Sequence, residues 1–369
     1  MIMGRFLLPE NGPVNVAQIV GNAKLGGVIS CILNYYRHID REKFRFDFIT
    51  YGPSDFDEDV CRIDGNARIH YIAPFDGATF LKAASQLKGI LSRGNYAIAH
   101  SHLTTLSAFA LPAAKRAGVP VRICHAHSTF DRQSDRYLAK AILRPFAARC
   151  ATHLMACGKL AAENLYRERA KQATILPNAI DLKRFSPEGP AAPKTGYTVL
   201  FAGRFAPQKN LFFLLEAFAK AIRIRPMTLV MLGDGAEHAA LKEKMQALGI
   251  SGSVRWVPPC DPAPWYRAAD VFALPSLYEG LPMVGLEAQA AGLCCLFSDK
   301  VSREADVGSG NEFLPLDLSV WAEALAKPRT RQNNTQSLRD AHFDIELEAH
   351  RLSDFYTAAL CDVAVPRAK

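Results

Sequence analysis

The sequence predicts an α/β protein made of two doubly wound domains that face each other across a cleft. Short β-rich runs alternate with longer helical stretches along the chain, a pattern typical of parallel sheets built from β-α-β units. Residues 185–196 are crowded with proline and glycine and have the composition of an interdomain linker. At 369 residues the chain is also too long for one ordinary core.

The alternation places strands on both sides of this linker and a helix at the end of the chain. In open α/β sheets the ligand lies beyond the carboxyl ends of the strands, so we expect the chemistry in the loops that follow them. The expected strands are residues 16–20, 46–50, 68–72, 97–100, 121–125, 153–156 and 174–176, then 198–202, 228–232, 253–257, 271–274 and 294–297, and the terminal helix is 343–360.

Composition indicates a globular cytosolic protein. Hydrophobic residues make up 49% of the chain and charged residues only 22%. We find no run of 18 uncharged apolar residues, and the first ten residues are too short and too soon interrupted for a signal peptide. The nine cysteines include no Cys-x-x-Cys pair, which indicates neither a disulfide framework nor a zinc site.

The net charge of +8 favours an anionic partner, such as nucleic acid, acidic lipid headgroups or phosphorylated metabolites. Nucleic acid is the least favoured, because the basic residues are scattered and form no known binding motif. Residues 80–91 and 136–149 combine apolar and cationic side chains at near-helical spacing. They are interpreted either as membrane-docking helices or as ordinary amphipathic helices that face a core.

The most informative local pattern is Glu279-x7-Glu287, which spans a predicted strand-to-helix turn. The helix is expected over residues 283–291 and stops at Gly292, a natural C-terminal cap. Its first N–H groups lack intrahelical acceptors and carry the positive end of the dipole, so they can hold a phosphate. The carboxylates can accept hydrogen bonds from sugar or ribose hydroxyls. The alternative is that both glutamates only complement the helix dipole.

Three other loops carry glycines or cations suited to an anion. Gly26 and Gly27 would let the backbone approach an anion, although a plain tight turn explains them equally well and they do not form Gly-x-Gly-x-x-Gly. Arg204 and Lys209 lie on a short loop before a helix, which suits a diphosphate, although solvated surface charge is the alternative. Gly233 ends the next strand in a turn that could pass beneath a ligand.

Alternate histidines end two strands of the first domain. They are His100 with His102 and His125 with His127, and the period of two puts each pair on one side of its strand. For His125 and His127 a metal pair is disfavoured, because the sequence indicates no third ligand nearby, and orientation of a sugar hydroxyl is favoured. The acidic run 55–59 superficially resembles an Asp-x-Asp metal motif but is interpreted as a solvated acidic turn.

Together these features resemble the retaining glycosyltransferases of family 4, which have the GT-B fold. The family signature is Glu279-x7-Glu287 with its Gly-Leu-Pro insert, and the resemblance covers essentially the whole chain. The supporting matches to the family are Gly26-Gly27, Gly203-Arg204 with Lys209, Pro177-Asn178 with Asp181, and Ala290-Ala291-Gly292. Within the family the chain most resembles bacterial exopolysaccharide and capsule enzymes, in the region Gly26-Gly27-Val28 and in residues 298–306 and 313–316.

The resemblance implies two Rossmann-like domains, one for the acceptor in residues 1–185 and one for the nucleotide sugar in 186–345. The remaining residues, 346–369, would form a helix and tail, with the helix returning to the first domain. Glu287 would bind the ribose hydroxyls, Glu279 the transferred sugar, and His127, or His125 if the register shifts, the reacting sugar. The other donor-binding positions implied are Gly26, Gly27, Arg204, Lys209, Gly233, Gly280, Leu281, Pro282, Met283 and Val284.

The expected activity is transfer of a hexose from a nucleotide diphosphate sugar, with UDP favoured, to a saccharide acceptor that is lipid-linked. The resemblance implies no cofactor and no required metal. We expect retention by front-face attack, because no carboxylate nucleophile is evident on the free face of the donor. Composition predicts a cytoplasmic protein without a nucleic-acid partner and leaves peripheral membrane contact open. Two alternatives remain, a sugar-nucleotide epimerase of similar shape and a non-catalytic partner subunit that keeps the fold.

Overall fold

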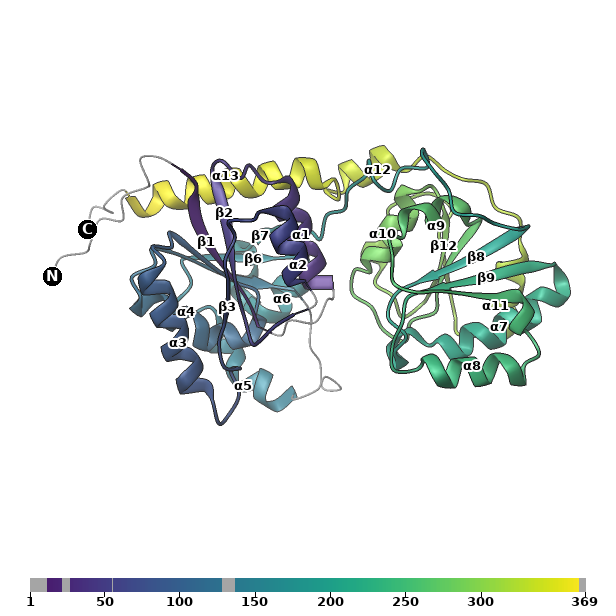
Figure 1. Ribbon diagram of the computed structural model, residues 1–369, viewed down its shortest axis with the longest axis horizontal. Coiled ribbons are helices and arrows are strands. Elements are labelled where there is room, and N and C mark those ends of the chain that lie inside the picture. The colour runs from purple at the N-terminus through teal and green to yellow at the C-terminus, as the bar shows by residue number, and fades with distance from the viewer. Residues whose placement is uncertain (1–11, 22–26, 55, 128–136, 365–369) are drawn as a thin grey trace. The chain divides into compact units, whose positions relative to one another are not determined.

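The computed structural model describes residues 12–21, 27–54, 56–127 and 137–364. The chain divides into two compact units, each built around its own parallel sheet (Figure 1). The first comprises Met1–Ala179 with Ile345–Lys369, and the second comprises Ile180–Asp344. The first boundary therefore lies at residue 179 rather than 185, because Ile180, Leu182 and Phe185 are buried in the core of the second unit.

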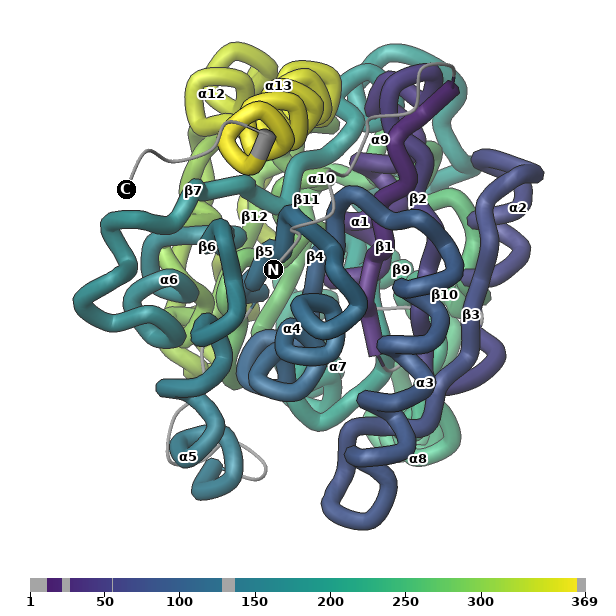
Figure 2. Tube along the Cα trace, turned by 90° about the vertical axis from the view of Figure 1, so that its left-hand side faces the viewer, coloured from purple at the N-terminus to yellow at the C-terminus, as the bar shows by residue number. Residues whose placement is uncertain are grey.

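The first domain contains a seven-stranded sheet in the order β3-β2-β1-β4-β5-β6-β7, which Figure 2 shows across the view. All seven strands expected before the linker are confirmed. They are β1 Val14–Gly21, β2 Phe44–Thr50, β3 Ile69–Tyr71, β4 Ile98–Ser101, β5 Val121–Ala126, β6 His153–Ala156 and β7 Thr174–Ile175. The helices are α1 Gly27–His38, α2 Asp57–Ile63, α3 Phe80–Arg93, α4 Ser107–Arg116, α5 Tyr137–Ala147 and α6 Lys159–Tyr166, with the 3-10 turns η1 Thr104–Leu106 and η2 Arg167–Gln172.

The second domain contains a six-stranded sheet in the order β10-β9-β8-β11-β12-β13. Its strands are β8 Tyr197–Ala202, β9 Met227–Leu232, β10 Val254–Val257, β11 Val271–Leu274, β12 Cys294–Ser298 and β13 Glu312–Leu314. The five expected strands are confirmed, and the short β13 was not predicted. The helices are α7 Leu211–Ile224, α8 His238–Ala247, α9 Ala263–Ala268, α10 Met283–Ala290, α11 Leu318–Ala326 and α12 Thr335–Asp340, with the turns η3 Pro207–Lys209, η4 Ser251–Ser253 and η5 Arg303–Ala305.

Alternate residues of β1 show why the strands are apolar almost throughout. Val16 packs into a cluster with α1, while the next residue, Ala17, packs into a separate cluster with α3 and α4. A parallel sheet covered on both faces needs apolar side chains at successive positions, which produces continuous rather than alternating hydrophobic runs. The two sheets therefore have the doubly wound architecture that the sequence predicts.

The final helix, α13 (Ile345–Ala364), belongs to the first domain. Its residues Leu352 and Tyr356 are buried in the same cluster as α1, and the Tyr356 ring packs 5.3 Å from the ring of Phe44. The chain thus leaves the first domain after residue 179 and contributes this helix to it from residue 345 onward. The expectation that the last helix returns to the first domain is confirmed.

The two segments with mixed apolar and cationic residues behave differently. Helix α3 buries Ala83, Leu87 and Leu91, so it is an ordinary amphipathic helix that faces the core. Helix α5 instead leaves Leu138 and Ile142 largely exposed, at 75% and 68%. Among the described residues, no helix combines the length and the apolar content that crossing a membrane requires.

Truncation of Leu352 tests whether α13 is part of the first core. Leu352→Ala should lower the free energy of unfolding by about 2–5 kcal/mol, because it leaves a cavity at a side chain that is only 2% exposed. Leu347→Ala, on the exposed face of the same helix (51% exposed), should change it by less than about 0.5 kcal/mol. Urea unfolding measures both variants. Equal losses would show that α13 does not pack as described.

Candidate functional site

In the second domain, the loops after β8 and β11 are joined at the carboxyl edge of the sheet. The N–H of Leu277 donates to the carbonyl of Gln208 at 2.8 Å, and the Gln208 side chain donates to the carbonyl of Tyr278 at 2.9 Å. Strand order reverses at β8, which has β9 on one side and β11 on the other. Such a reversal opens a crevice between the two departing loops, the usual ligand position in this architecture.

Two predicted donor-site residues meet directly in these joined loops. The Lys209 ammonium forms an ion pair with Oε1 of Glu279, and the Ser276 hydroxyl lies 3.3 Å from the same oxygen. Both charged side chains are largely buried. Arg204 lies on the same loop as Lys209 and is exposed. The pair places a cation suited to phosphate beside a carboxylate suited to hydroxyls.

The backbone near Gly233 closes tightly against the loop that carries Arg204. A Cβ on Gly233 would lie 1.9 Å from the carbonyl oxygen of Gly203, and its φ of +139° also favours glycine. The N–H of Phe205 donates to the carbonyl of Asp234 at 2.9 Å, which ties the two loops together. The expected turn at Gly233 is confirmed and lies beside the cation-bearing loop.

Helix α10 presents its N-terminus at this same edge. Pro282 is its N-cap, with an extended backbone and no side-chain cap, and its carbonyl accepts from the N–H of Gly285. The N–H groups of Met283 and Val284 therefore have no acceptor within the helix and carry the positive end of its dipole. Gly280 is exposed and Leu281 is partly buried in the approach to the helix. The predicted helix is confirmed, and Gly292 follows it with a positive φ, as expected of a C-terminal glycine.

Glu287 lies one turn into α10 and has a buried tyrosine as its partner. The hydroxyl of Tyr266 donates to Oε2 of Glu287 at 2.9 Å. Burial raises the pKa of Glu287 to about 7, while the hydrogen bond from Tyr266 opposes that rise. This carboxyl group therefore changes its charge close to neutral pH, unlike an ordinary exposed glutamate.

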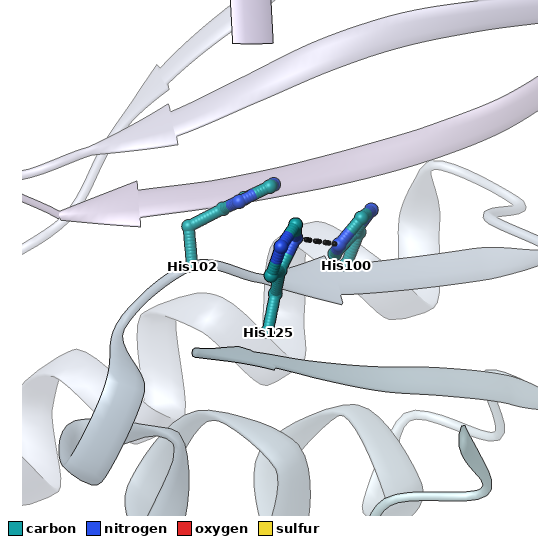
Figure 3. Close-up of side chains that lie close together, drawn as sticks. All are labelled: His100, His102 and His125. Carbon is teal, nitrogen blue, oxygen red and sulfur yellow. Dashed lines mark hydrogen bonds between the residues drawn. The ribbon is translucent and has the colours of Figure 1, made fainter. Parts of the chain in front are cut away.

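In the first domain, the alternate histidines at the ends of β4 and β5 form one cluster, of which Figure 3 shows the three buried members, His100, His102 and His125. His100 Nε2 lies 3.0 Å from His125 Nδ1, and His102 Nδ1 lies 2.6 Å from His127 Nε2. The rings of His125 and His127 are 3.9 Å apart, which confirms that both point to the same side. His125 is fully buried, whereas His127 follows the end of β5 and is partly exposed. Of the two, His127 is therefore the more exposed side chain.

Gln18, on β1, orients His102 and His127, the more exposed half of this cluster. Oε1 of Gln18 accepts from Nε2–H of His102 at 2.7 Å, so Nδ1 of His102 carries a lone pair. That lone pair accepts from Nε2–H of His127, which leaves Nδ1 of His127 unprotonated. This atom is buried and has no partner in the described part of the chain. The hydrogen bonds therefore assign His127 one tautomer, with a free acceptor at Nδ1.

Gln18 also orients His100 and His125, the inner half of the cluster, through Tyr356 of helix α13. Its amide nitrogen donates to the Tyr356 hydroxyl at 3.3 Å, and that hydroxyl lies 2.7 Å from Nδ1 of His100. Tyr356 thus donates to His100, whose Nε2–H donates in turn to His125. Nε2–H of His125 is buried without a partner among the described residues. Burial lowers the pKa of all four histidines, to about 3 for His100, which keeps the cluster neutral.

The cluster also bears on metal binding. One nitrogen each from His100, His102 and His125 lie within 4.8 Å of one another, a grouping that could hold a metal ion. The expectation that no third ligand lies near the His125–His127 pair was therefore wrong, because β4 brings two more histidines. Both nitrogens of His100 and of His102 already have hydrogen-bond partners, so a bound ion would have to replace those bonds.

The structure also bears on the acidic run 55–59 and on the pair Gly26-Gly27. The acidic run was expected to form a turn, but Asp57 begins helix α2, where Asp57 and Asp59 lie in the first turn and complement the helix dipole. The first residue of the run, Asp55, lies outside the described residues. Gly26 also lies outside them, and Gly27 is the exposed first residue of α1.

Several residues of these sites were not predicted from the sequence. Gln18, Tyr356 and Tyr266 hold the polar groups described above, yet each comes from a segment far along the chain from its partner. His100 and His102 carried a usable signal, because alternate histidines ended both strands, and adjacent parallel strands bring such pairs together. Ser276, which contacts Glu279, had no distinguishing pattern.

The buried histidines predict a stability that falls with acidification. An unfolded histidine takes up a proton near pH 6.5, whereas a histidine with a lowered pKa in the folded protein does so only at lower pH. The free energy of unfolding should therefore fall below pH 6.5, by up to about 1.4 kcal/mol per pH unit for each buried histidine. Urea unfolding between pH 7.5 and 5.5 should show a shallower fall for His125→Gln. An identical slope in both proteins would contradict the neutral cluster.

Comparisons with known proteins agree with this architecture. Residues 25–184 match the family model described as Glycosyltransferase Family 4, and residues 196–327 match the one described as Glycosyl transferases group 1. The putative glycosyltransferase EpsF of Bacillus subtilis is 32% identical over 341 residues, which cover 85% of this chain and 87% of that protein. A second relative is UDP-Gal:alpha-D-GlcNAc-diphosphoundecaprenol alpha-1,3-galactosyltransferase of Escherichia coli, 29% identical over 59% of this chain and 62% of its own.

Solved structures share the fold across nearly the whole chain. The crystal structure of HepE from Anabaena, in complex with UDP and glucose, has a TM-score of 0.76 at 15% identity and covers 94% of this chain and 100% of its own. Sucrose-phosphate synthase of Thermosynechococcus elongatus has a TM-score of 0.72 at 20% identity, with 95% and 100% covered. With two doubly wound domains and a relative at 32% identity along most of its length, the chain belongs to glycosyltransferase family 4 and has the GT-B fold.

Proposed function

We propose that this glycosyltransferase moves a hexose from a UDP-sugar, with retention, to a lipid-linked saccharide in the synthesis of an exopolysaccharide or another cell-surface glycan. The observation that carries the proposal is the Lys209–Glu279 pair at the edge where strand order reverses, beside the N-terminus of α10. The galactosyltransferase relative supports the donor and acceptor classes, because its name gives a UDP-sugar donor and a diphosphoundecaprenol-linked acceptor.

In the donor site, Arg204, Lys209 and the free N–H groups of Met283 and Val284 bind the diphosphate. Lys209 is paired with Glu279 when no ligand is present, so donor binding would exchange this pair for a phosphate and a sugar hydroxyl. Glu287 accepts hydrogen bonds from the ribose, with Tyr266 fixing its orientation. Gly233 lets the backbone close against Gly203, which fixes the loop that carries Arg204.

In the transfer step, the bond between the anomeric carbon and the departing phosphate oxygen breaks, and a bond from an acceptor hydroxyl oxygen to the same face of that carbon forms. The hydroxyl proton passes to the departing phosphate. Negative charge develops on the nucleoside diphosphate, and the Lys209 cation and the helix dipole stabilise it. Donor binding and charge stabilisation by these groups need no metal in this proposal.

His127 is proposed as the polar group that hydrogen-bonds the transferred sugar. The tautomer assigned above leaves its Nδ1 as an acceptor, which suits a sugar hydroxyl as donor. His125 is too deeply buried for that contact and acts through its packing against His127. The enzyme is proposed to work at the cytoplasmic face of the membrane, without nucleic acid and without a cofactor.

Thermal-shift screening against a panel of nucleotide sugars tests the donor class. A ligand that binds only the folded protein stabilises it by about 2.7 kcal/mol at 100 times its dissociation constant. UDP-sugars should raise the melting temperature more than GDP- or ADP-sugars do. Incubation with the donor alone separates the epimerase alternative, since an epimerase would equilibrate the sugar and a transferase would at most hydrolyse it slowly.

Removal of Lys209 tests the phosphate site. Lys209→Ala should lower turnover by about 10² or more, the scale for removing one preorganised group that stabilises developing charge. Lys220→Ala removes an exposed lysine from α7 in the same domain and should leave turnover unchanged. Steady-state kinetics measure both variants. Full activity of Lys209→Ala would exclude this residue from the phosphate site.

The pKa of Glu287 predicts that nucleotide affinity depends on pH. A carboxylate accepts from both ribose hydroxyls only when ionised, so UDP affinity should fall as the pH drops from 8 to 6 through the pKa near 7. Glu287→Gln should bind UDP more weakly at pH 8 and should lose the part of the pH dependence that comes from Glu287. Calorimetry on both proteins isolates the effect, because titration of the nucleotide itself contributes equally to each. Matching pH profiles would exclude the ribose role.

A further inference from the structure

The first domain contains an apolar pocket that the donor site and the histidine cluster do not use. It has a volume of about 450 Å³, within the range of small-molecule sites. It is formed by the loop after β3, the start of α3, the turn after β4, and helices α4 and α5. Its apolar lining comes mainly from Phe75, Phe80, Leu103, Leu106, Phe109 and Leu143.

We propose that this pocket binds the hydrocarbon chain of an isoprenoid phosphate, the lipid part of the acceptor. The inference rests on the proposed function, because it assumes a lipid-linked acceptor. It adds where the lipid binds and which residues recognise it.

The aromatic wall of the pocket suits a hydrocarbon chain. The ring of Phe109 lies 6.0 Å from that of Phe75 and 5.5 Å from that of Phe80, so the three rings form one continuous surface. Burying a methylene group against such a surface contributes about 0.8 kcal/mol. A sugar would leave its hydroxyls unpaired against the same rings.

The polar groups of the pocket favour an anion at one end of that chain. The Asp76 carboxylate is already used by its own loop, where it accepts from the N–H of Thr79 at 3.0 Å and from the Thr79 hydroxyl at 2.7 Å. Lys140 is also one of the lining residues, and it forms no ion pair or hydrogen bond with a described residue. An unpaired lysine beside an apolar pocket is complementary to a phosphate attached to a hydrocarbon.

The location of the pocket fits an acceptor lipid in two ways. Leu103 directly follows His102 of the histidine cluster, so the pocket adjoins the polar end of β4. Helix α5, which lines the pocket through Leu143, also exposes Leu138, Ile142 and Phe146 at spacings of four residues. These three side chains form an apolar stripe along α5, of the kind that contacts a membrane surface. A lipid held by a bilayer would meet apolar side chains both on this stripe and inside the pocket.

Direct binding of farnesyl phosphate, used below its critical micelle concentration, tests the proposal on the full chain without any sugar nucleotide. Calorimetry should show binding of farnesyl phosphate, weaker binding of farnesol, and none of inorganic phosphate. Lys140→Ala should weaken farnesyl phosphate at least threefold and leave farnesol unchanged. Binding of inorganic phosphate as tight as that of farnesyl phosphate would overturn the hydrocarbon assignment.

Two substitutions on α5 separate the pocket from the outer stripe. Leu143→Asp puts a charge into the lining and should weaken farnesyl phosphate at least tenfold, whereas Leu138→Asp, at the exposed stripe, should leave it unchanged. Ala139→Trp narrows the pocket from an exposed position and should act like Leu143→Asp if the latter variant fails to fold. Equal affinity in all variants, or an equal loss in Leu138→Asp, would overturn the pocket.

The outcome can be told apart from failure of the proposed function. Each variant should keep the UDP affinity of the unaltered protein, since its substitution lies in the first domain and the nucleotide site in the second. Intact UDP binding without farnesyl phosphate binding would exclude lipid binding by the pocket and would leave the proposed function standing. Farnesyl phosphate binding with no transfer from any UDP-sugar would exclude the proposed activity and would still support lipid binding by the pocket.

Discussion

Both candidate sites depend on one constraint, which is that parallel strands end at the same edge of a sheet. In the second domain β8 and β11 are adjacent, so the loops that follow them meet at this edge and bring Lys209 and Glu279 into contact. In the first domain the order reverses at β1, and β4 and β5 bring their histidines together beside Gln18. Charged and polar groups can lie on these loops because the apolar strands below them already supply the two cores.

Buried polar groups are stabilised differently in the two domains. In the second domain opposite charges pair, and the loops that carry them are held by backbone hydrogen bonds, so the groups are ready for a charged ligand. In the first domain the imidazoles stay neutral and are linked by hydrogen bonds that begin at Gln18, which leave Nε2 of His125 and Nδ1 of His127 without a partner among the described residues. The chain includes Tyr356, so the last helix contributes to the order of the cluster as well as to the core.

Apolar side chains near the same edge of the first sheet have a different role. The rings around Phe109 enclose a pocket, and α5 contributes to it while leaving its own outer face apolar and exposed. The exposed apolar residues of α5 are Leu138, Ile142 and Phe146, spaced four residues apart on one face. The polar cluster and the apolar pocket thus lie next to each other, because Leu103 of the pocket follows His102 of the cluster.

The amino-acid sequence by itself determined the two-domain α/β fold, twelve of the thirteen strands described here, and the strand-loop-helix unit that carries Glu279 and Glu287, because these depend on local periodicity and on turn residues. It did not determine β13, whose three residues are too few for a periodic signal. Only the tertiary structure paired Lys209 with Glu279, placed Tyr266 against Glu287, and joined four histidines to Gln18 and Tyr356. Those contacts connect segments far apart in the chain, and their geometry follows from strand order, which local sequence patterns do not encode.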